Sequence, residues 1–174
     1  MVCENLLIVG AGAYAQVAAE IAADMGVFRQ IAFVDDNAKI LWNGLPVAGT
    51  TDDIERLAEE YGAICVAIGN PQVRLSLLNK IKEKFPEKIV SLISPRAYIS
   101  PAAKVMPGCV VEPMAVVHSQ CVLEEGCIIS AGAVVNHTST CCSGVHLDCN
   151  ATVYPYTIVP AGMKISSGEV YKNV

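Results

Sequence analysis

The sequence predicts an α/β domain built on a parallel sheet, followed by an all-β solenoid. Three observations predict this order. From Ile93 to Val170 the chain divides into hexapeptides without an insertion. Before Ile93, short apolar strands alternate with helices, which is the pattern of a parallel sheet with crossover helices. Charge follows the same division, because 20 of the 29 charged residues precede Ile93.

The hexapeptide run places two inward residues in each repeat. Its first position is aliphatic apart from Cys141, its fifth is small in most repeats, and its fourth is often Gly. The first positions are Ile93, Ile99, Val105, Val111, Val117, Leu123, Ile129, Val135, Cys141, Leu147, Val153, Val159 and Ile165. A period of six differs from the helical period of 3.6 and the strand period of two. It suits a triangular coil of eighteen residues, which buries its inner side chains by stacking on the next coil.

The first domain opens with a strand, a glycine-rich turn and a helix. Residues 5–9 are apolar and predict a buried strand that runs into Gly10-Ala11-Gly12. A helix is expected over residues 13–25, because Gly26 can end it. This strand-turn-helix unit is the first step of the predicted parallel sheet.

The remaining elements of this domain repeat the alternation. Strands are expected over residues 31–34, 45–48 and 63–68. Thr51-Asp52-Asp53 is expected to cap a helix over residues 54–61, and another helix follows Gly69-Asn70-Pro71 and runs through Ile81. Residues 88–93 then lead into the solenoid. The sequence therefore predicts two domains, at residues 1–90 and 91–174.

Candidate ligand-binding residues follow the expected strands, where ligands bind in parallel sheets. The turn Gly10-x-Gly12-x-x-Ala15 offers bare backbone and a helix N-terminus to a phosphate, although a tight turn without a ligand has the same pattern. Asp35 and Asp36 follow the second strand, where an acid can bind a ribose hydroxyl or cap a turn. A nicotinamide dehydrogenase fits poorly, because the chain has no second mononucleotide half, and one nucleotide fits better.

Composition excludes several classes of protein. The net charge is −5, the pI is about 5.1 and Lys and Arg do not cluster, so nucleic acid and anionic membrane are poor partners. No apolar stretch approaches the roughly 18 residues of a membrane span, and residues 6–9 are too short for a signal peptide, so we expect a cytoplasmic protein.

The eight cysteines are expected to be buried small hydrophobes rather than disulfides, since four of them fall at inward repeat positions. The group Cys141, Cys142, His146, Asp148 and Cys149 contains metal-ligand residue types. Its spacing matches no common zinc pattern, and no metal is expected.

The order of motifs resembles a family of sugar acyltransferases. Gly10-Ala11-Gly12, Val34-Asp35-Asp36, Ala67-Ile68-Gly69-Asn70 with Arg74 after it, and then the hexapeptides are similar to the sialic acid O-acetyltransferase and UDP-N-acetylbacillosamine N-acetyltransferase family. The resemblance spans nearly the whole chain. It implies a Rossmann-like domain that binds a sugar nucleotide, UDP-linked by preference, and a left-handed parallel β-helix that takes acetyl from acetyl-CoA in a homotrimer.

The resemblance also implies site residues. The nucleotide would be surrounded by Gly10, Gly12, Ala13, Tyr14, Asp35, Asp36, Gly69 and Asn70. His137, in Asn136-His137, would be the general base, because a neutral imidazole can take a proton near pH 7; a solvated surface histidine is the alternative. His146 matches a histidine that contacts the acetyl donor. It lies nine residues, or half a coil, after His137, so the two are expected on different faces and would share a site only across a subunit interface.

Several positions depart from the family pattern. Thr138 stands where the family has an acid, Tyr14 replaces a histidine, and Cys141-Cys142 replaces an aliphatic residue and Gly. Only about two coils follow His137, which predicts a shortened β-helix. We therefore expect an acetyl-CoA-dependent acetyltransferase that acts on a nucleotide-linked amino sugar for surface glycan biosynthesis. The alternative is a non-catalytic sugar-nucleotide-binding or scaffold protein that has lost the acetyl-CoA groove.

Overall fold

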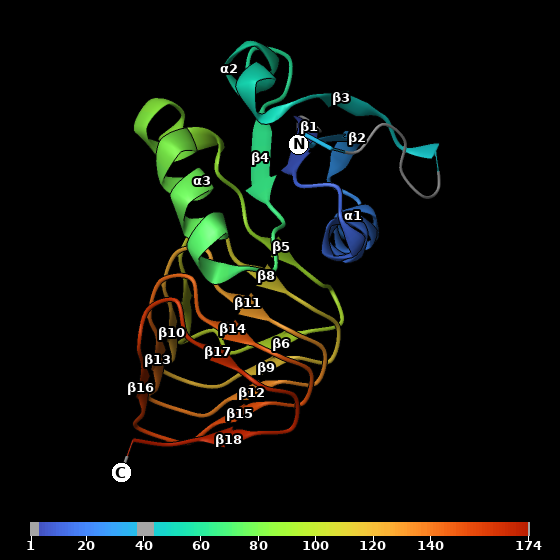
Figure 1. Cartoon of the computed structure of the whole chain (residues 1–174). Coiled ribbons are helices and arrows are strands. Elements are labelled where there is room, and N and C mark those ends of the chain that lie inside the picture. Colours follow the sequence, from blue (N-terminus) through green and yellow to red (C-terminus); the bar gives the residue numbers. More distant parts are fainter. Residues whose placement is uncertain (1–3, 38–43, 174) are drawn as a thin grey trace.

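The N-terminal part of the chain forms a parallel sheet with helices on both faces. The computed structural model describes residues 4–37 and 44–173 (Figure 1). The sheet has the order β3-β2-β1-β4, and all of its pairs are parallel. Its strands are β1 (Glu4–Val9), β2 (Phe28–Val34), β3 (Val47–Gly49) and β4 (Ala63–Val66).

Alternating side chains of β1 build two separate cores. Leu6 and Ile8 pack with helix α1 (Ala13–Met25), whereas Leu7 and Val9 pack with α2 (Ile54–Leu57) and α3 (Pro71–Lys84). Period-two alternation thus places α1 on one face of the sheet and the other two helices on the opposite face. Short 3-10 helices η2 (Thr51–Asp53) and η3 (Pro86–Lys88) complete this part.

The second half is a parallel β-helix of stacked triangular coils. Its two-residue strands form three sheets of order β16-β13-β10-β7, β17-β14-β11-β8-β5 and β18-β15-β12-β9-β6. The strands are β5 (Leu92–Ile93), β6 (Tyr98–Ile99), β7 (Lys104–Val105), β8 (Val110–Val111), β9 (Val116–Val117), β10 (Val122–Leu123), β11 (Ile128–Ile129), β12 (Val134–Val135), β13 (Thr140–Cys141), β14 (His146–Leu147), β15 (Thr152–Val153), β16 (Ile158–Val159), β17 (Lys164–Ile165) and β18 (Val170–Tyr171). Paired residues lie eighteen apart, for example Val134 and Thr152, which confirms the predicted coil length.

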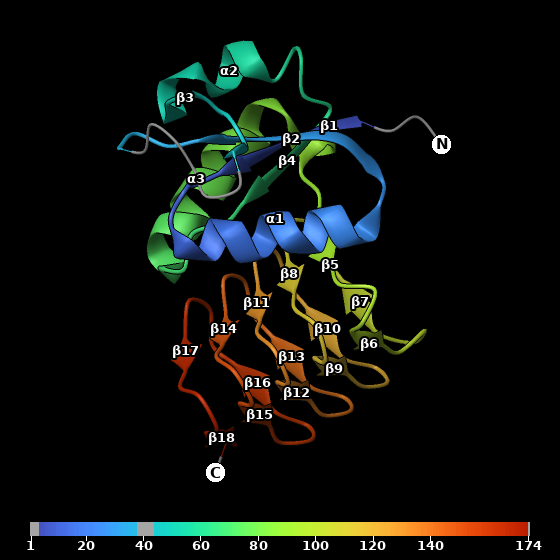
Figure 2. The ribbon, with the colours of Figure 1, turned by 90° about the vertical axis from the view of Figure 1, so that its right-hand side faces the viewer.

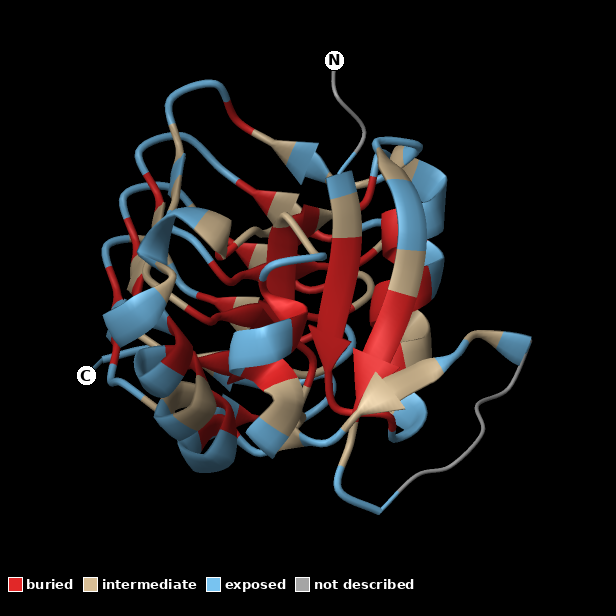
Figure 3. Cartoon of the chain, turned by 90° about the horizontal axis from the view of Figure 1, so that it is seen from above, coloured by how far each residue is buried: buried red, intermediate tan, exposed pale blue. Residues whose placement is uncertain are grey.

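The predicted inward positions form the core of the β-helix. First-position residues from Val111 to Ile165 are buried, and so are the small fifth-position residues from Cys109 to Ala151. Cys109, Cys121 and Cys127 are free thiols inside this core, as the sequence predicts. The buried positions continue from the strands of the N-terminal sheet into the coils that lie behind them in Figure 3.

Element boundaries in the first domain differ modestly from the prediction. Strand β2 starts three residues early, at Phe28, and β3 starts two residues late, at Val47. The predicted helix over residues 54–61 is wrong in length, because α2 ends at Leu57 and turns follow it. Its entry is a capping box in which Thr50 and Asp53 exchange hydrogen bonds, so a 3-10 turn forms before the α-helix.

Both α1 and α3 join the sheet to the β-helix. Figure 2 shows α1 between the sheet and the coils, and it packs on the outward residues Leu92, Val110 and Ile128. Helix α3 runs along one corner, where a Cβ on Gly144 would lie 2.5 Å from Leu75 Cδ1. The predicted division after residue 90 falls between η3 and β5, next to a bridge that ties Ile89 to β4, and it stays a prediction.

Within residues 4–37 and 44–173, no helix combines the length and the apolar character that a membrane span requires.

Candidate functional site

A cavity of about 620 Å³ lies beyond the carboxyl ends of β1, β2 and β4. In the order β3-β2-β1-β4 the chain passes from β1 to β2 on one side and later returns to β4 on the other side of β1. The cavity therefore lies at the switch point where parallel sheets bind ligands. Its lining residues are Gly10, Val34, Asp35, Asp36, Asn37, Thr51, Ile68, Gln72, Val73, Ser76, Leu77 and Lys80.

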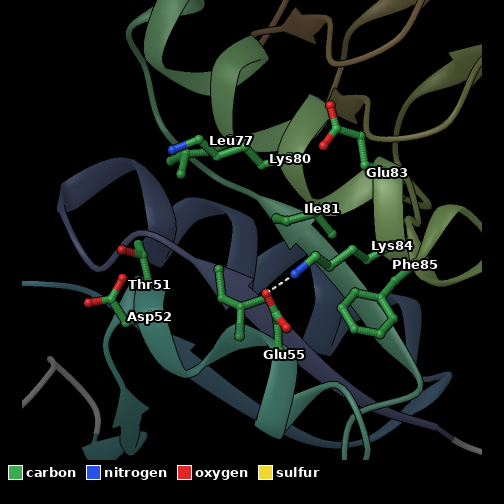
Figure 4. Close-up of a pocket in the computed structure, with 10 residues that line it drawn as sticks. Thr51, Asp52, Glu55, Leu77, Lys80, Ile81, Glu83, Lys84 and Phe85 are labelled. Carbon is green, nitrogen blue, oxygen red and sulfur yellow. Dashed lines mark hydrogen bonds and ion pairs between the residues drawn. The ribbon is translucent and has the colours of Figure 1, made fainter.

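A smaller cavity of about 300 Å³ adjoins it between α2 and α3 (Figure 4). The two cavities share Thr51, Leu77 and Lys80. Lys84 crosses the smaller cavity to form an ion pair with Glu55, and this pair closes the far side. An extended ligand in the larger cavity could therefore continue past Lys80.

The glycine-rich turn packs tightly against the strand that follows it. Gly10 has φ +104, and a Cβ there would lie 3.0 Å from Ile68 Cγ1 and 3.1 Å from the Ala67 carbonyl oxygen. A carboxylate oxygen of Asp35 accepts a hydrogen bond from the Ala11 N–H at 2.8 Å. The Ala11 N–H of this turn is therefore already bonded to a carboxylate of the protein itself.

Asp36 has a structural partner as well. Its Oδ1 accepts hydrogen bonds from the Thr51 N–H at 2.8 Å and the Thr51 hydroxyl at 3.0 Å, so it holds the start of η2. This is the capping role that the sequence left open as the alternative to ribose binding. Since a carboxylate has about four lone-pair sites, the bonds to Thr51 leave acceptor capacity toward the cavity.

The predicted nucleotide-binding residues fall into two groups. Gly10, Asp35 and Asp36 line the larger cavity, whereas Gly12, Ala13, Tyr14, Gly69 and Asn70 do not. Asn70 caps α3 by accepting from the Val73 N–H at 3.1 Å. The sequence analysis missed Ser76 and Lys80, which also line the cavity. Both lie on the face of α3 that is turned toward the sheet.

Arg74 is a fully buried cation at the junction of the domains. Its guanidinium donates to the carbonyl oxygens of Ile68, Gly126 and Gly144, each at 2.7 Å. A buried charge is stable only when such partners replace water. Arg74 therefore ties the end of β4 to two successive coils, a role that no sequence pattern indicated.

His146 lies in the same junction and is only 5% exposed. Its Nδ1 is 3.2 Å from the Gly69 carbonyl oxygen, and its Nε2 is 3.4 Å from the Ser130 hydroxyl. The carbonyl can only accept, so we assign the proton to Nδ1 and leave Nε2 to accept from Ser130. Burial lowers the pKa of this imidazole, which keeps it neutral near pH 7.

Tyr14 and Glu112 complete the buried polar group beside His146. The Tyr14 ring centre is 6.2 Å from that of His146, and its buried hydroxyl has no hydrogen-bond partner among the described residues. Burial raises the pKa of the Tyr14 phenol, and the nearby Glu112 carboxylate raises it further. Burial also raises the pKa of Glu112, although the Ala131 N–H donates to its Oε2 at 3.0 Å.

His137 is exposed on the turn between β12 and β13. Its ring meets the Tyr156 ring edge to face, with centres 5.1 Å apart and planes at 87°. His146 belongs to β14, in a different sheet from β12, so the expectation that the two histidines occupy different faces is confirmed. His118 is also exposed.

No three His, Cys, Asp or Glu side chains converge as metal ligands in the part of the chain that the structure describes.

Comparison with known proteins gives consistent relatives. Residues 5–81 match the PglD N-terminal domain family. The acetyltransferase domain of PglB from Neisseria gonorrhoeae FA1090, solved in complex with acetyl coenzyme A, is 33% identical with a TM-score of 0.92, over 97% of this chain and 82% of that one. A comparison with curated proteins gave no match.

More distant structures share the fold. PerB from Caulobacter crescentus, in complex with CoA and GDP-perosamine, is 22% identical with a TM-score of 0.73, over 97% of this chain and 88% of that one. WeeI from Acinetobacter baumannii AYE is 19% identical with a TM-score of 0.60, over 95% and 87%. The predicted fold class is confirmed: a Rossmann-like parallel sheet followed by a left-handed parallel β-helix.

Proposed function

Because the chain belongs to the hexapeptide-repeat sugar acetyltransferases with a PglD-type N-terminal domain, we propose that it transfers acetyl from acetyl-CoA to a nucleotide-linked amino sugar, with His137 as general base. The observation that carries the proposal is the likeness to the PglB acetyltransferase domain over almost the entire chain. The protein is an acyltransferase, and acetyl-CoA is its co-substrate.

The larger cavity is the proposed site of the nucleotide. Its volume of about 620 Å³ falls within the roughly 300–1,000 Å³ of typical ligand pockets. Asp35 and Asp36 lie where acids bind a ribose, and Lys80 is the cation that lines both cavities. The relative PerB binds GDP-perosamine, which supports a nucleotide-linked sugar as the acceptor. We propose a UDP-linked sugar from the family resemblance.

The predicted residues outside this cavity remain candidates for the sugar end. Gly12, Ala13 and Tyr14 begin α1, and Gly69 and Asn70 precede α3. The positive end of a helix dipole favours a negatively charged group, although at α3 Pro71 has no N–H and the Val73 N–H already bonds to Asn70. We propose that the two helix starts position the diphosphate and sugar.

His137 would act on the attacking group of the sugar. As the sugar amine attacks the thioester carbonyl, the neutral imidazole takes the proton that the new C–N bond displaces. Collapse of the tetrahedral intermediate breaks the C–S bond, and the CoA thiolate leaves and takes up a proton. Exposure of His137 suits this step, because both substrates must reach it.

A homotrimer is proposed because the sites are distributed over different faces. The outward residues of the sheet next to His137 are Tyr98, Val116, Val134, Thr152 and Val170, a mostly apolar row that Thr152 interrupts. A second copy that covers this row would bring its own residues to His137. The contact of His146 with the acetyl donor stays a proposal, and because His146 is buried beside Tyr14 of α1, a donor would have to displace that packing to reach it.

The biological setting is also proposed from the resemblance. Acetylated nucleotide sugars of this kind are precursors for surface glycans and are made in the cytoplasm. Purification of the acetylated product from cells with and without the gene would test that role.

Calorimetric titration with acetyl-CoA, UDP and GDP tests the central proposal. Binding of acetyl-CoA together with UDP is the expected result, and stronger binding of GDP would change the nucleotide but keep the reaction. Binding of a nucleotide without acetyl-CoA would contradict the proposal and favour a non-catalytic sugar-nucleotide-binding protein.

A further inference from the structure

We propose that Tyr156 is a positioning residue that holds the imidazole of His137 in one orientation for proton transfer. The inference rests on the proposed function, in which His137 is the general base. Its direct basis is the edge-to-face contact between the two rings, with centres 5.1 Å apart and planes at 87°. Aromatic rings favour this arrangement over a parallel sandwich.

The stacking of the β-helix brings Tyr156 to His137. Tyr156 lies eighteen residues after Thr138 and therefore occupies the same turn position in the next coil. Its N–H donates to the His137 carbonyl oxygen at 3.2 Å. The backbones of the two turns are thus in direct contact where the rings meet.

Side chains of the His137 turn fix the two turns further. The Asn136 side-chain amide donates to the Val153 carbonyl oxygen at 3.0 Å, and the Ser139 hydroxyl donates to that of Tyr154 at 2.9 Å. The Thr157 N–H in turn donates to the Ser139 hydroxyl at 3.2 Å. These bonds fix the backbones of the two turns against each other and so keep Tyr156 beside His137.

Packing and backbone preference do not explain a tyrosine at position 156. This is the fourth hexapeptide position, where Gly108, Gly126 and Gly144 stand in other repeats. Tyr156 has φ +59, in the left-handed region that is strained for a bulky side chain. It is also 74% exposed, so it gains little from burial. Met114, Gln120, Thr138 and Asn150 have the same positive φ at this hexapeptide position, so the conformation belongs to the turn, and the ring contact with His137 is what distinguishes Tyr156.

The contact supplies an orientation that His137 otherwise lacks. Within residues 4–37 and 44–173, no side chain hydrogen-bonds to the His137 ring, and the Tyr156 ring is its aromatic partner. An exposed imidazole without such a partner samples several rotamers, and only some of these direct a ring nitrogen at the substrate. Tyr156 would restrict that sampling before the substrate arrives.

The test combines NMR of labelled histidine with kinetics. Tyr156→Phe keeps the ring and removes the hydroxyl, whereas Tyr156→Asn removes the ring and tolerates positive φ. Tyr154→Asn is the matched control, because Tyr154 is an exposed tyrosine of the same turn. Long-range ¹H–¹⁵N spectra report the tautomer and pKa of His137, whose signals are assigned by their loss in His137→Asn. Turnover is followed by thiol release from acetyl-CoA with a UDP-linked amino sugar.

We expect Tyr156→Phe to keep the His137 spectrum and kcat. Tyr156→Asn should shift the His137 signals, move the pH profile of kcat and lower kcat about tenfold, with little change in KM for acetyl-CoA. Unchanged His137 signals in Tyr156→Asn, or equal changes in Tyr154→Asn, would overturn the proposal. Altered His137 signals with unchanged kcat would confirm the ring contact but reject its role in catalysis. Full turnover in His137→Asn would instead reject the general base, a result that the Tyr156 variants cannot produce.

Discussion

Arg74 shows how one side chain can hold the N-terminal sheet and the β-helix together. Its guanidinium fills the junction and satisfies carbonyl oxygens from the end of β4 and from two coils. In a dry site, each carbonyl that loses its donor keeps a desolvation cost of its own. A single substitution therefore disturbs three backbone segments at once.

Replacing Arg74 by Met should lower the free energy of unfolding by at least about 3 kcal/mol, because several buried carbonyls lose their donor. Urea denaturation followed by circular dichroism measures this loss. Gln72→Ala is the control on the same helix, since Gln72 is exposed and makes one long hydrogen bond of 3.4 Å to the Gly162 carbonyl oxygen. Equal stability of the two variants would contradict the role assigned to Arg74.

His146 should make stability depend on pH. Its folded pKa lies below the unfolded value of about 6.5, so the unfolded chain binds the proton first as the pH falls. The free energy of unfolding should be constant above neutrality and decrease from about pH 6.5 downward to the folded pKa. Thermal unfolding across that range measures the effect.

His146→Asn should remove this decrease, whereas His118→Asn, at an exposed position, should keep it. Burial raises the pKa of the neighbouring Glu112, so its contribution has the opposite sign: it grows as the pH falls through the raised folded pKa and is complete near the unfolded value of about 4.3. Since Glu112 is present in both variants, the difference between them isolates His146. Identical pH profiles for the two would refute the assignment.

At the scale of elements, the corner glycines set how closely α3 can approach the β-helix. Leu78 lies against Gly108 and Gly126, Leu75 against Gly144, and Gln72 reaches Gly162. These glycines occur every eighteen residues and have positive φ. Their lack of a side chain serves both the turn and the close contact.

Gly144→Ala should destabilise the protein more than Gly168→Ala. Both residues have positive φ, which costs an L-residue roughly 1–2 kcal/mol. Only at Gly144 would the new Cβ also collide with Leu75, at 2.5 Å, and overpacking adds about 1–3 kcal/mol. Melting temperatures measure the difference. Equal melting temperatures for the two variants would contradict this expectation, because α3 would then shift away from position 144 without a loss of stability.

The sequence predicts the elements better than it predicts their contacts. The hexapeptide period specifies each inward residue, because every coil repeats the same local packing, and Gly26 ends α1 as expected. The length of α2 was mispredicted, because after Leu57 the N–H groups of Glu59 and Glu60 bond to carbonyl oxygens three residues back and tighten the chain into turns. Turn chemistry of this kind depends on a few hydrogen bonds that periodicity does not encode.

Predictions of the site divide in the same way. Gly10, Asp35 and Asp36 were placed at one cavity because strand ends in a parallel sheet converge. The burial of Gly69 and His146 against each other could not be predicted, because it depends on how the first domain packs against the second. The Tyr156 contact needs the register of two coils together with the ring orientation, and only the register is present in the sequence.

At the scale of the whole molecule, the N-terminal part of the chain leaves sheet β18-β15-β12-β9-β6 of the β-helix uncovered. Helix α1 packs on Leu92, Val110 and Ile128 of sheet β17-β14-β11-β8-β5, whereas sheet β18-β15-β12-β9-β6 lies on another side of the coils (Figure 1). Its outward row includes Tyr98 and Val170, which are both exposed. A homotrimer that buries this sheet is the assembly proposed above.

Val134→Asp should convert the proposed trimer into smaller species, because an unpaired carboxylate would lie in an apolar interface. Light scattering after size-exclusion chromatography measures the mass. Val27→Glu, an exposed apolar residue of the first domain, is the control and should leave the mass unchanged. A monomeric parent protein, or a trimer that tolerates Val134→Asp, would contradict this interface.

The contact between α3 and the coils depends on two spacings, the rise of the helix along its axis and the distance between neighbouring strands. Three helical residues rise about 4.5 Å, and neighbouring strands lie about 4.8 Å apart, so Leu78, Leu75 and Gln72 step from coil to coil nearly in phase. The mismatch of about 0.3 Å per step accumulates slowly and stays below an atomic radius over these coils. Because α3 begins next to the coil of Gly162, coils added or removed beyond that point would not alter this contact, and the length of the solenoid can vary independently of the N-terminal sheet and helices.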